Sequence, residues 1–323
     1  MLLPTAVISA SAGIPPTLLS LRCSGRSVAS AIFTASAAFA APAVFAACAA
    51  APTLVIASIL NSAMMEPALL KELLENLYDR YNRPEFIPDD PISVPHRFTE
   101  RADREIAGFF AATIAWGNRR SIVRNGHRMM LLMDNAPADF VRHASERELA
   151  QLTSFVHRTF NGHDLRDFVL GLRGFEARYG GLGAFFEQRY ETHRDLRPVL
   201  AEFRREFFTA PHAPRCEKHL SSIERGAACK RLCMYLRWMV RRDDRGVDFG
   251  LWRRIPMSAL YLPLDLHVGV TGRALGLLLR RQNDWRAVEE ITSRLREFDA
   301  EDPVRYDFSL FGAGMDGYLK DHE

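Results

Sequence analysis

Charged side chains are nearly absent from the first 63 residues of this 323-residue chain. Only Arg22 and Arg26 are charged in that segment, which also contains 18 alanines. The whole sequence has 42 Lys or Arg and 39 Asp or Glu, so 79 of its 81 charged residues follow residue 63. The chain therefore joins two unlike polypeptides, and only residues 64–323 have the composition of a soluble globular domain.

The uncharged run from Ser27 to Met65 is long enough for a membrane span, but it is rich in Ala, Ser and Thr and contains Pro42 and Pro52. We expect residues 1–63 to lie outside the folded domain. Translation starting at Met64 or Met65 is the favoured explanation. A targeting segment and a membrane anchor are the alternatives. A cytoplasmic protein is expected.

Cysteine is also scarce, and no two cysteines form a C-x-x-C pair. The absence of such spacing argues against a structural zinc site or an iron–sulfur cluster, so no metal and no cofactor are expected. Cys229 and Cys233 are predicted to be buried free thiols inside one helix. The five cysteines are Cys23, Cys48, Cys216, Cys229 and Cys233.

After residue 65 the apolar residues recur with helical periodicity almost throughout, which predicts an all-α domain of two packed lobes with a cleft between them. Four prolines between residues 83 and 97 predict a loop there. The expected helices cover residues 66–81, 100–116, 119–134, 145–153, 163–178, 182–190, 195–208, 226–242, 266–280, 284–297 and 303–320.

Positive charge is concentrated in residues 218–254, which hold ten Lys or Arg and four acids. On a helix, Lys230, Arg237 and Arg241 lie within about 40° of one another. This pattern predicts a basic ridge that follows a phosphate backbone. The alternative is a solvated face whose arginines pair with neighbouring acids.

Three segments resemble a bacterial family of conserved hypothetical proteins with no established activity. They are Lys230–Arg241 (KRLCMYLRWMVR), Gly246–Asp248 (GVD) and Leu262–Val268 (LPLDLHV). The resemblance extends over about residues 66–320.

A more distant resemblance links the chain to the helix-hairpin-helix DNA glycosylases. Leu264–Val268 (LDLHV) and Arg273–Gly276 (RALG) are similar to their V-D-T-H-V…R-L-G segment. The resemblance implies their two-lobed helical fold and places residues 226–242 after the hairpin. The chain departs from the family in two ways. It lacks the L-P-G-V-G hairpin signature, and at that place only Gly226 suggests a tight turn. In addition, 34 residues lie between Lys230 and Asp265, more than in most glycosylases with a catalytic lysine.

The resemblance implies two catalytic residues. Cleavage of an N-glycosidic bond builds positive charge on the sugar, which a carboxylate at Asp265 would stabilise. The amine of Lys230 would attack the sugar. It must be neutral to do so, and nearby cations favour the neutral form of an amine. The alternatives are a helix N-cap for Asp265, a phosphate contact for Lys230, and metal ligation by Asp265 and His267.

The same resemblance implies double-stranded DNA as the partner and a base that leaves the duplex to reach the site. Four aromatic residues are candidates to receive that base: Trp116, Trp238, Tyr235 and Trp252. The expected DNA contacts are Arg231, Arg237, Arg241, Asn118, Arg119 and Gly226, with Gly117–Arg119 matching a loop that probes the duplex.

Together these observations predict a DNA glycosylase, or a glycosylase that is also an abasic-site lyase, of base excision repair. The first alternative is a non-catalytic nucleic-acid-binding module on the same helical fold. The second is a helical interaction protein tethered by residues 1–63.

Overall fold

A computed structural model of the chain describes residues 65–315. All of them belong to one compact unit, Pro52–Glu323. The other unit, Met1–Ala51, and the expectations for residues 1–63 lie outside the described residues.

The described residues are mostly helical, which confirms the all-α prediction at that level. Their α-helices are α2 (Pro67–Tyr81), α3 (Ser93–His96), α4 (Arg101–Thr113), α5 (Arg119–Leu132), α6 (Pro137–His143), α7 (Glu146–Gln151), α8 (Gly162–Tyr179), α9 (Leu182–His193), α10 (Leu196–Phe207), α11 (Lys230–Val240), α12 (Leu266–Ala274), α13 (Trp285–Arg296) and α14 (Asp307–Met315). Their short 3-10 helices are η1 (Pro84–Phe86), η2 (Leu152–Ser154), η3 (Pro214–His219), η4 (Ile223–Arg225), η5 (Met257–Ala259) and η6 (Pro303–Tyr306).

Two short strands were not predicted. β1 (Val156–His157) and β2 (Phe160–Asn161) pair antiparallel, with Val156 opposite Asn161 and His157 opposite Phe160. They form a tight hairpin whose turn includes Arg158, a non-glycine residue with a φ of 55°.

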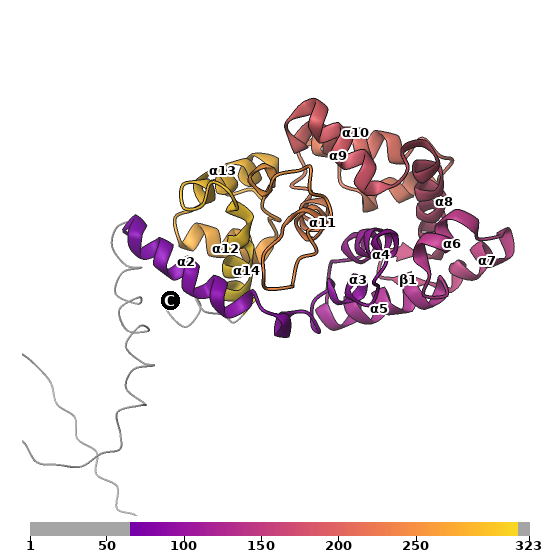
Figure 1. The fold of residues 1–323 in the computed structure, drawn as a ribbon, viewed down its shortest axis with the longest axis horizontal. Coiled ribbons are helices and arrows are strands. Elements are labelled where there is room, and N and C mark those ends of the chain that lie inside the picture. The colour runs from indigo at the N-terminus through magenta and orange to yellow at the C-terminus, as the bar shows by residue number, and fades with distance from the viewer. Residues whose placement is uncertain (1–64, 316–323) are drawn as a thin grey trace, which may run out of the picture. The chain divides into compact units, whose positions relative to one another are not determined.

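Helix α11 lies between two groups of helices (Figure 1). On one side are α2, α12, α13 and α14, and on the other are the helices α3 to α10. α11 packs closely on α4, because a Cβ on Gly108 would come within 2.5 Å of the Met239 methyl group. This central position explains why every residue from Leu232 to Val240 is buried.

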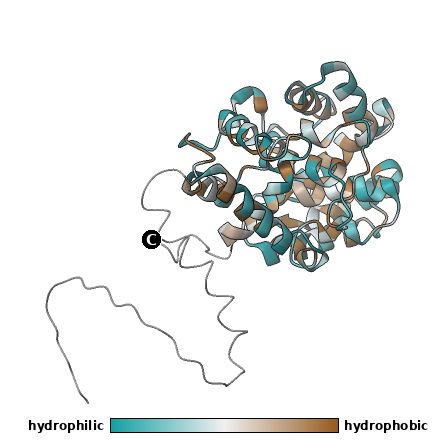
Figure 2. Cartoon of the chain, turned by 60° about the vertical axis from the view of Figure 1, so that its left-hand side comes forward, coloured by the Kyte–Doolittle hydropathy of each residue, from teal (hydrophilic) through white to brown (hydrophobic). Residues whose placement is uncertain are grey.

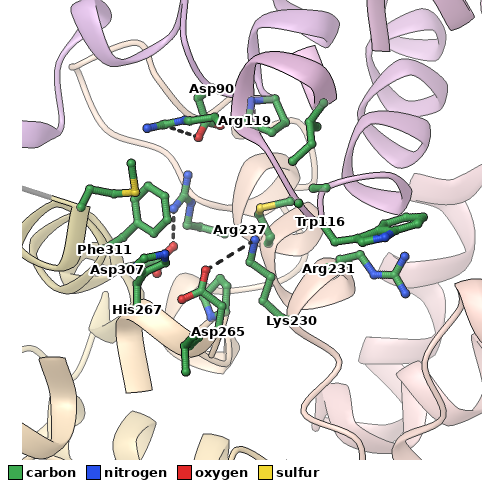
Figure 3. Close-up of a pocket in the computed structure, with 18 of the residues that line it drawn as sticks. Asp90, Trp116, Arg119, Lys230, Arg231, Arg237, Asp265, His267, Asp307 and Phe311 are labelled. Atoms are coloured by element: carbon green, nitrogen blue, oxygen red, sulfur yellow. Dashed lines mark hydrogen bonds and ion pairs between the residues drawn. The ribbon is translucent and has the colours of Figure 1, made fainter. Parts of the chain in front are cut away.

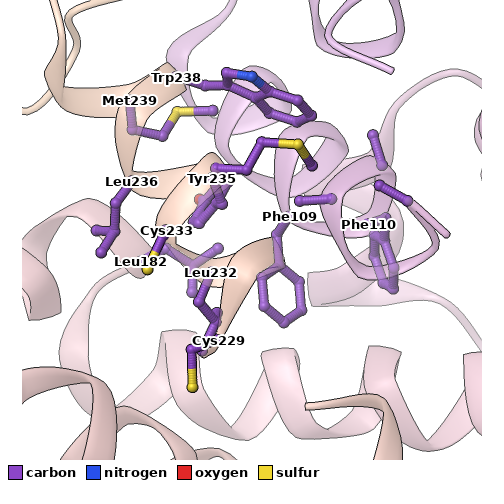
Figure 4. Close-up of a cluster of buried hydrophobic side chains, with 14 of the residues drawn as sticks. Phe109, Phe110, Leu182, Cys229, Leu232, Cys233, Tyr235, Leu236, Trp238 and Met239 are labelled. Carbon is purple, nitrogen blue, oxygen red and sulfur yellow. The ribbon is translucent and has the colours of Figure 1, made fainter. Parts of the chain in front are cut away.

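The core follows from that arrangement. Large apolar side chains of α11 meet those of α4 and α9 in one continuous cluster, which includes Phe109, Leu182, Tyr235 and Trp238 (Figure 4). Hydrophobic residues lie mostly on the sides of the helices that face the interior of the domain, and hydrophilic residues lie mostly on the outer sides (Figure 2). Burial of these faces is the main source of stability of a helical domain of this kind.

The expected helix boundaries differ from the observed ones where a turn intervenes. The helix expected over 226–242 begins only at Lys230, because Cys229 has a left-handed φ of 50°. Cys229 therefore precedes the helix that was expected to contain it. The helix expected over 266–280 ends at Ala274, and Gly276, with a φ of 73°, turns the chain. The proline-rich stretch 83–97 contains η1 and α3, since Pro is tolerated in a first helical turn.

The cysteines of the described residues agree with the prediction of buried free thiols. Cys216, Cys229 and Cys233 are all unpaired and buried. Cys23 and Cys48 lie outside the described residues. No helix among residues 65–315 has the length and apolar character needed to cross a bilayer.

Candidate active site

A cavity of about 720 Å³ opens where the first turn of α11 meets the start of α12, one face of α14 and the turn before α5 (Figure 3). α11 reaches solvent only at its first turn, where Lys230 and Arg231 are partly buried and the rest of the helix is buried. The ionisable side chains that line the cavity are Asp90, Arg119, Lys230, Arg231, Arg237, Asp265, His267 and Asp307.

Lys230 and Asp265 face each other in this cavity (Figure 3). Lys230 Nζ lies 3.8 Å from Asp265 Oδ2, and the two side chains keep 25% and 22% of their exposure. Both groups are therefore accessible to a ligand.

Asp265 is also the N-cap of α12, because its Oδ1 accepts a hydrogen bond from the Val268 amide at 3.0 Å. Its two oxygens have separate tasks: one fixes the carboxylate to the helix, and the other faces the amine. The capping interpretation and the functional one are compatible.

Sequence reasoning missed Asp307, which lines the same cavity. Its buried carboxylate pairs with Arg237, as Figure 3 shows. Burial raises the pKa of Asp307 to about 6, although Arg237 opposes the shift. A signal was present in the sequence, since Asp307 is the single charged residue in the nine residues of α14.

The predicted basic ridge is wrong. Arg237 and Arg241 are 4% and 1% exposed, so they do not form a surface that follows a phosphate backbone. Burial alone would lower the pKa of Arg241, but nearby carboxylates outweigh it and raise that pKa. The carboxylates that pair with the two arginines are Asp243, Asp248, Asp302 and Asp307.

Arg231 lies at the other end of the cavity. Its guanidinium stacks 4.9 Å from the centre of the Trp116 ring and donates a hydrogen bond to the Thr113 carbonyl. Burial lowers the pKa of Arg231 to about 10. Trp116 also stacks on His219, with ring centres 5.8 Å apart.

Of the four aromatic candidates, Trp116 alone lines the cavity. Tyr235, Trp238 and Trp252 are fully buried in the core. These three side chains stabilise the fold and are not placed to receive a base.

The turn before α5 lies at the cavity mouth. Gly117 has a φ of 98°, which favours glycine, and Asn118 caps α5 by accepting a hydrogen bond from the Ser121 amide at 3.1 Å. Arg119 pairs with Asp90 at 2.8 Å. The Arg119 guanidinium also lies over the rings of Phe86 and Phe311, at 5.1 and 5.3 Å.

Gly226 is not in the cavity lining. It ends η4 in a left-handed conformation with a φ of 79°, four residues before Lys230. Its carbonyl accepts a hydrogen bond from the Trp285 amide at 2.9 Å, which ties this turn to α13. The tight turn suggested by the sequence is present.

His267 lines the cavity beside Asp265, but no third ligand accompanies them. Among residues 65–315 no group of three or more His, Cys, Asp or Glu side chains is arranged to hold a metal ion. The structure gives no support to metal ligation by Asp265 and His267.

A family model described as "Protein of unknown function (DUF2400)" matches residues 90–316, well over half of the chain. The chain belongs to the DUF2400 family. This agrees with the predicted membership of an uncharacterised family. The part of the chain that matches DUF2400 includes every residue that lines the cavity except Phe86. No curated protein and no solved structure matches the chain. The DUF2400 match specifies no activity, and similarity to DNA glycosylases stays a prediction.

Proposed function

We propose that this protein is a DNA glycosylase that uses Lys230 as its nucleophile and Asp265 as the carboxylate beside it. One observation carries the proposal: Lys230 Nζ lies 3.8 Å from Asp265 Oδ2 inside a cavity of about 720 Å³. The two residues are 35 positions apart in sequence. An amine and a carboxylate side by side in one cavity are what the resemblance to helix-hairpin-helix glycosylases implies.

The proposed reaction needs both groups. The ammonium of Lys230 first releases a proton to water. The resulting amine forms a bond to C1′ of the sugar, and the bond from C1′ to the base breaks with its electron pair leaving on the base, which takes up a proton. The carboxylate of Asp265 stabilises the positive charge that develops on the sugar. The nitrogen then loses a proton, and the bond from C1′ to the ring oxygen breaks with its electron pair going to that oxygen, which takes up a proton. The resulting Schiff base is hydrolysed by water, which frees the enzyme.

Local geometry supports the finer fold proposal as well. The Gly226 turn stands four residues before the start of α11, and the resemblance to helix-hairpin-helix proteins implies a hairpin turn there. The cavity is lined from both groups of helices that flank α11. We therefore infer a two-lobed glycosylase-like fold with the site in the cleft.

A duplex with an abasic site tests the nucleophile without knowledge of the natural lesion. The aldehyde form of that sugar condenses with an amine, and borohydride reduces the Schiff base to a permanent adduct. We expect an adduct with the wild-type protein and at least a tenfold weaker one with Lys230→Gln. The chain has only four lysines, so Lys218→Gln, which removes an exposed lysine, is a matched control that should keep the adduct.

A panel of damaged duplexes tests the carboxylate. Asp265→Asn removes the charge but keeps a side chain that caps a helix equally well. We expect base release to fall about a hundredfold, as when a single charge-stabilising group is lost, while the melting temperature stays within about 2 °C. Full activity of Asp265→Asn would reduce Asp265 to a cap and remove the main support for the proposal.

The non-catalytic alternative has its own signature. A protein that binds duplex DNA, releases no base from the panel and forms no Lys230-dependent adduct is a binding module. That result would overturn the glycosylase proposal.

A further inference from the structure

Helix α5 carries a row of exposed arginines that begins at the mouth of the cavity. Arg120, Arg124 and Arg128 are all exposed and lie four residues apart, which places them on one stripe of the helix. The first of them is two residues after Asn118, which lines the cavity.

The start of this row lines a groove of its own, of about 650 Å³. Pro88 and Asp89 form one wall, and the first two turns of α5 form the other. Asn118 and Arg119 line both the groove and the cavity, so the two hollows adjoin. In the groove three arginines, Arg119, Arg120 and Arg124, face one exposed aspartate.

The row is not explained by ion pairs within the protein. Over residues 65–315, neither Arg120 nor Arg124 has a carboxylate within ion-pair distance, whereas Arg119 is paired with Asp90. Arg128 donates a hydrogen bond to the Ser154 carbonyl, which leaves its charge uncompensated. Like charges four residues apart on a helix repel each other, so this row has an unfavourable arrangement unless an anionic partner covers it.

We propose that the phosphate backbone of duplex DNA lies in this groove and along the arginine row of α5. This surface replaces the buried ridge predicted from the sequence. The inference rests on the proposed function, because the groove leads to the cavity of Lys230 and Asp265. It names the surface that holds the duplex while a nucleotide enters the cavity.

Charge and length both fit that partner. Arg120 to Arg128 extends about 12 Å along the helix at 1.5 Å per residue. Phosphates of one DNA strand recur about every 3.4 Å along the duplex axis but lie about 7 Å apart along the strand itself, so the row spans two to three phosphates. The positive end of the α5 dipole, near Asn118, adds to the same potential.

The test measures duplex binding by fluorescence anisotropy over a series of salt concentrations. Arg120→Gln/Arg124→Gln should weaken binding about tenfold at 0.15 M salt and reduce the salt slope by about 1.8, since each lost phosphate contact removes about 0.9. The control variant is Arg242→Gln/Arg253→Gln. It removes two exposed arginines that have no carboxylate within ion-pair distance among the described residues and that follow the far end of α11. Its affinity should stay within twofold of the wild type, with an unchanged slope.

The outcomes separate this inference from the proposed function. If the α5 variant binds like the wild type, or if both double variants lose affinity equally, the groove is not the DNA surface, whatever the catalytic result. If the α5 variant binds weakly but releases base at the wild-type rate when DNA is saturating, both proposals hold. If it binds weakly while the wild type releases no base and forms no adduct, the groove stands and the glycosylase proposal fails. A wild-type protein that binds duplex RNA more tightly than duplex DNA would also overturn the assignment.

Discussion

The arginines of α11 and those of α5 look alike in sequence and have opposite environments in the structure. Arg237 lies on α11 and Arg241, four residues later, is the C-cap of that helix, and both are buried among carboxylates. Arg120 and Arg124 lie one turn apart on α5, and both are exposed with no such partner in the described part of the chain. Spacing and residue type are the same in the two pairs.

The difference shows that charge spacing on a helix does not by itself identify a binding surface. A helix packed on one side exposes its arginines, as α5 does. A helix packed on both sides, as α11 is, must bury them, and a buried guanidinium requires carboxylates to offset its desolvation. Arg237 and Arg241 therefore stabilise the fold, whereas Arg120 and Arg124 are available to bind a partner.

The largest effect on stability is expected from removing Arg241 from its buried ion pairs. Arg241→Met leaves the buried Asp302 without its arginine and Asp248 with Arg237 alone, so the free energy of unfolding should fall by about 3–5 kcal/mol. Chemical denaturation measures this loss. The adjacent and exposed Arg242→Met is the control, with a change within about 0.5 kcal/mol. Equal losses in the two variants would show that the pairs around Arg241 are not formed.

A smaller effect concerns pH and a second buried basic group. His219 is 3% exposed, and burial lowers its pKa to about 4, although Asp164 opposes the shift. Because the folded pKa lies below the unfolded value of about 6.5, only the unfolded state takes up the proton as the pH falls from 6.5 toward 4. From pH 7 to pH 5 the free energy of unfolding should drop by up to about 2 kcal/mol from this group alone.

His219→Gln should remove that contribution and flatten the pH dependence. His163→Gln, which changes an exposed histidine, should leave it unchanged. Thermal melting of the wild type and the two variants at pH 7, 6 and 5 tests whether His219 causes the pH dependence. A wild-type slope in His219→Gln would mean that His219 is protonated in the fold.

The smallest effect on stability belongs to the exposed row. Arg120→Gln/Arg124→Gln should change the free energy of unfolding by no more than about 0.5 kcal/mol, with a slight gain because like charges four residues apart repel. The same denaturation experiment measures it. A fall of several kcal/mol in the free energy of unfolding would show that Arg120 and Arg124 stabilise the fold, as Arg237 and Arg241 do.

Much of the candidate site was accessible from sequence because its signals are local or come from a motif. The N-cap role of Asp265 depends only on the residues that follow it, and the turn at Gly226 depends on a residue that tolerates a positive φ. Pairing Lys230 with Asp265 required the resemblance to glycosylases, since no short-range pattern connects residues 35 positions apart. Asp307 was missed because it comes from still further along the chain.

What the sequence determined by itself was the helical class, the approximate position of most helices and the capping role of Asp265, since periodicity and capping act within a few residues. Only the tertiary structure decided which arginines are buried. Asp302 and Asp307 reach Arg241 and Arg237 from 61 and 70 positions away, because η6 and α14 pack beside α11. The burial of a charge depends on every element that surrounds it, and that enclosure comes from long-range packing rather than from the local sequence.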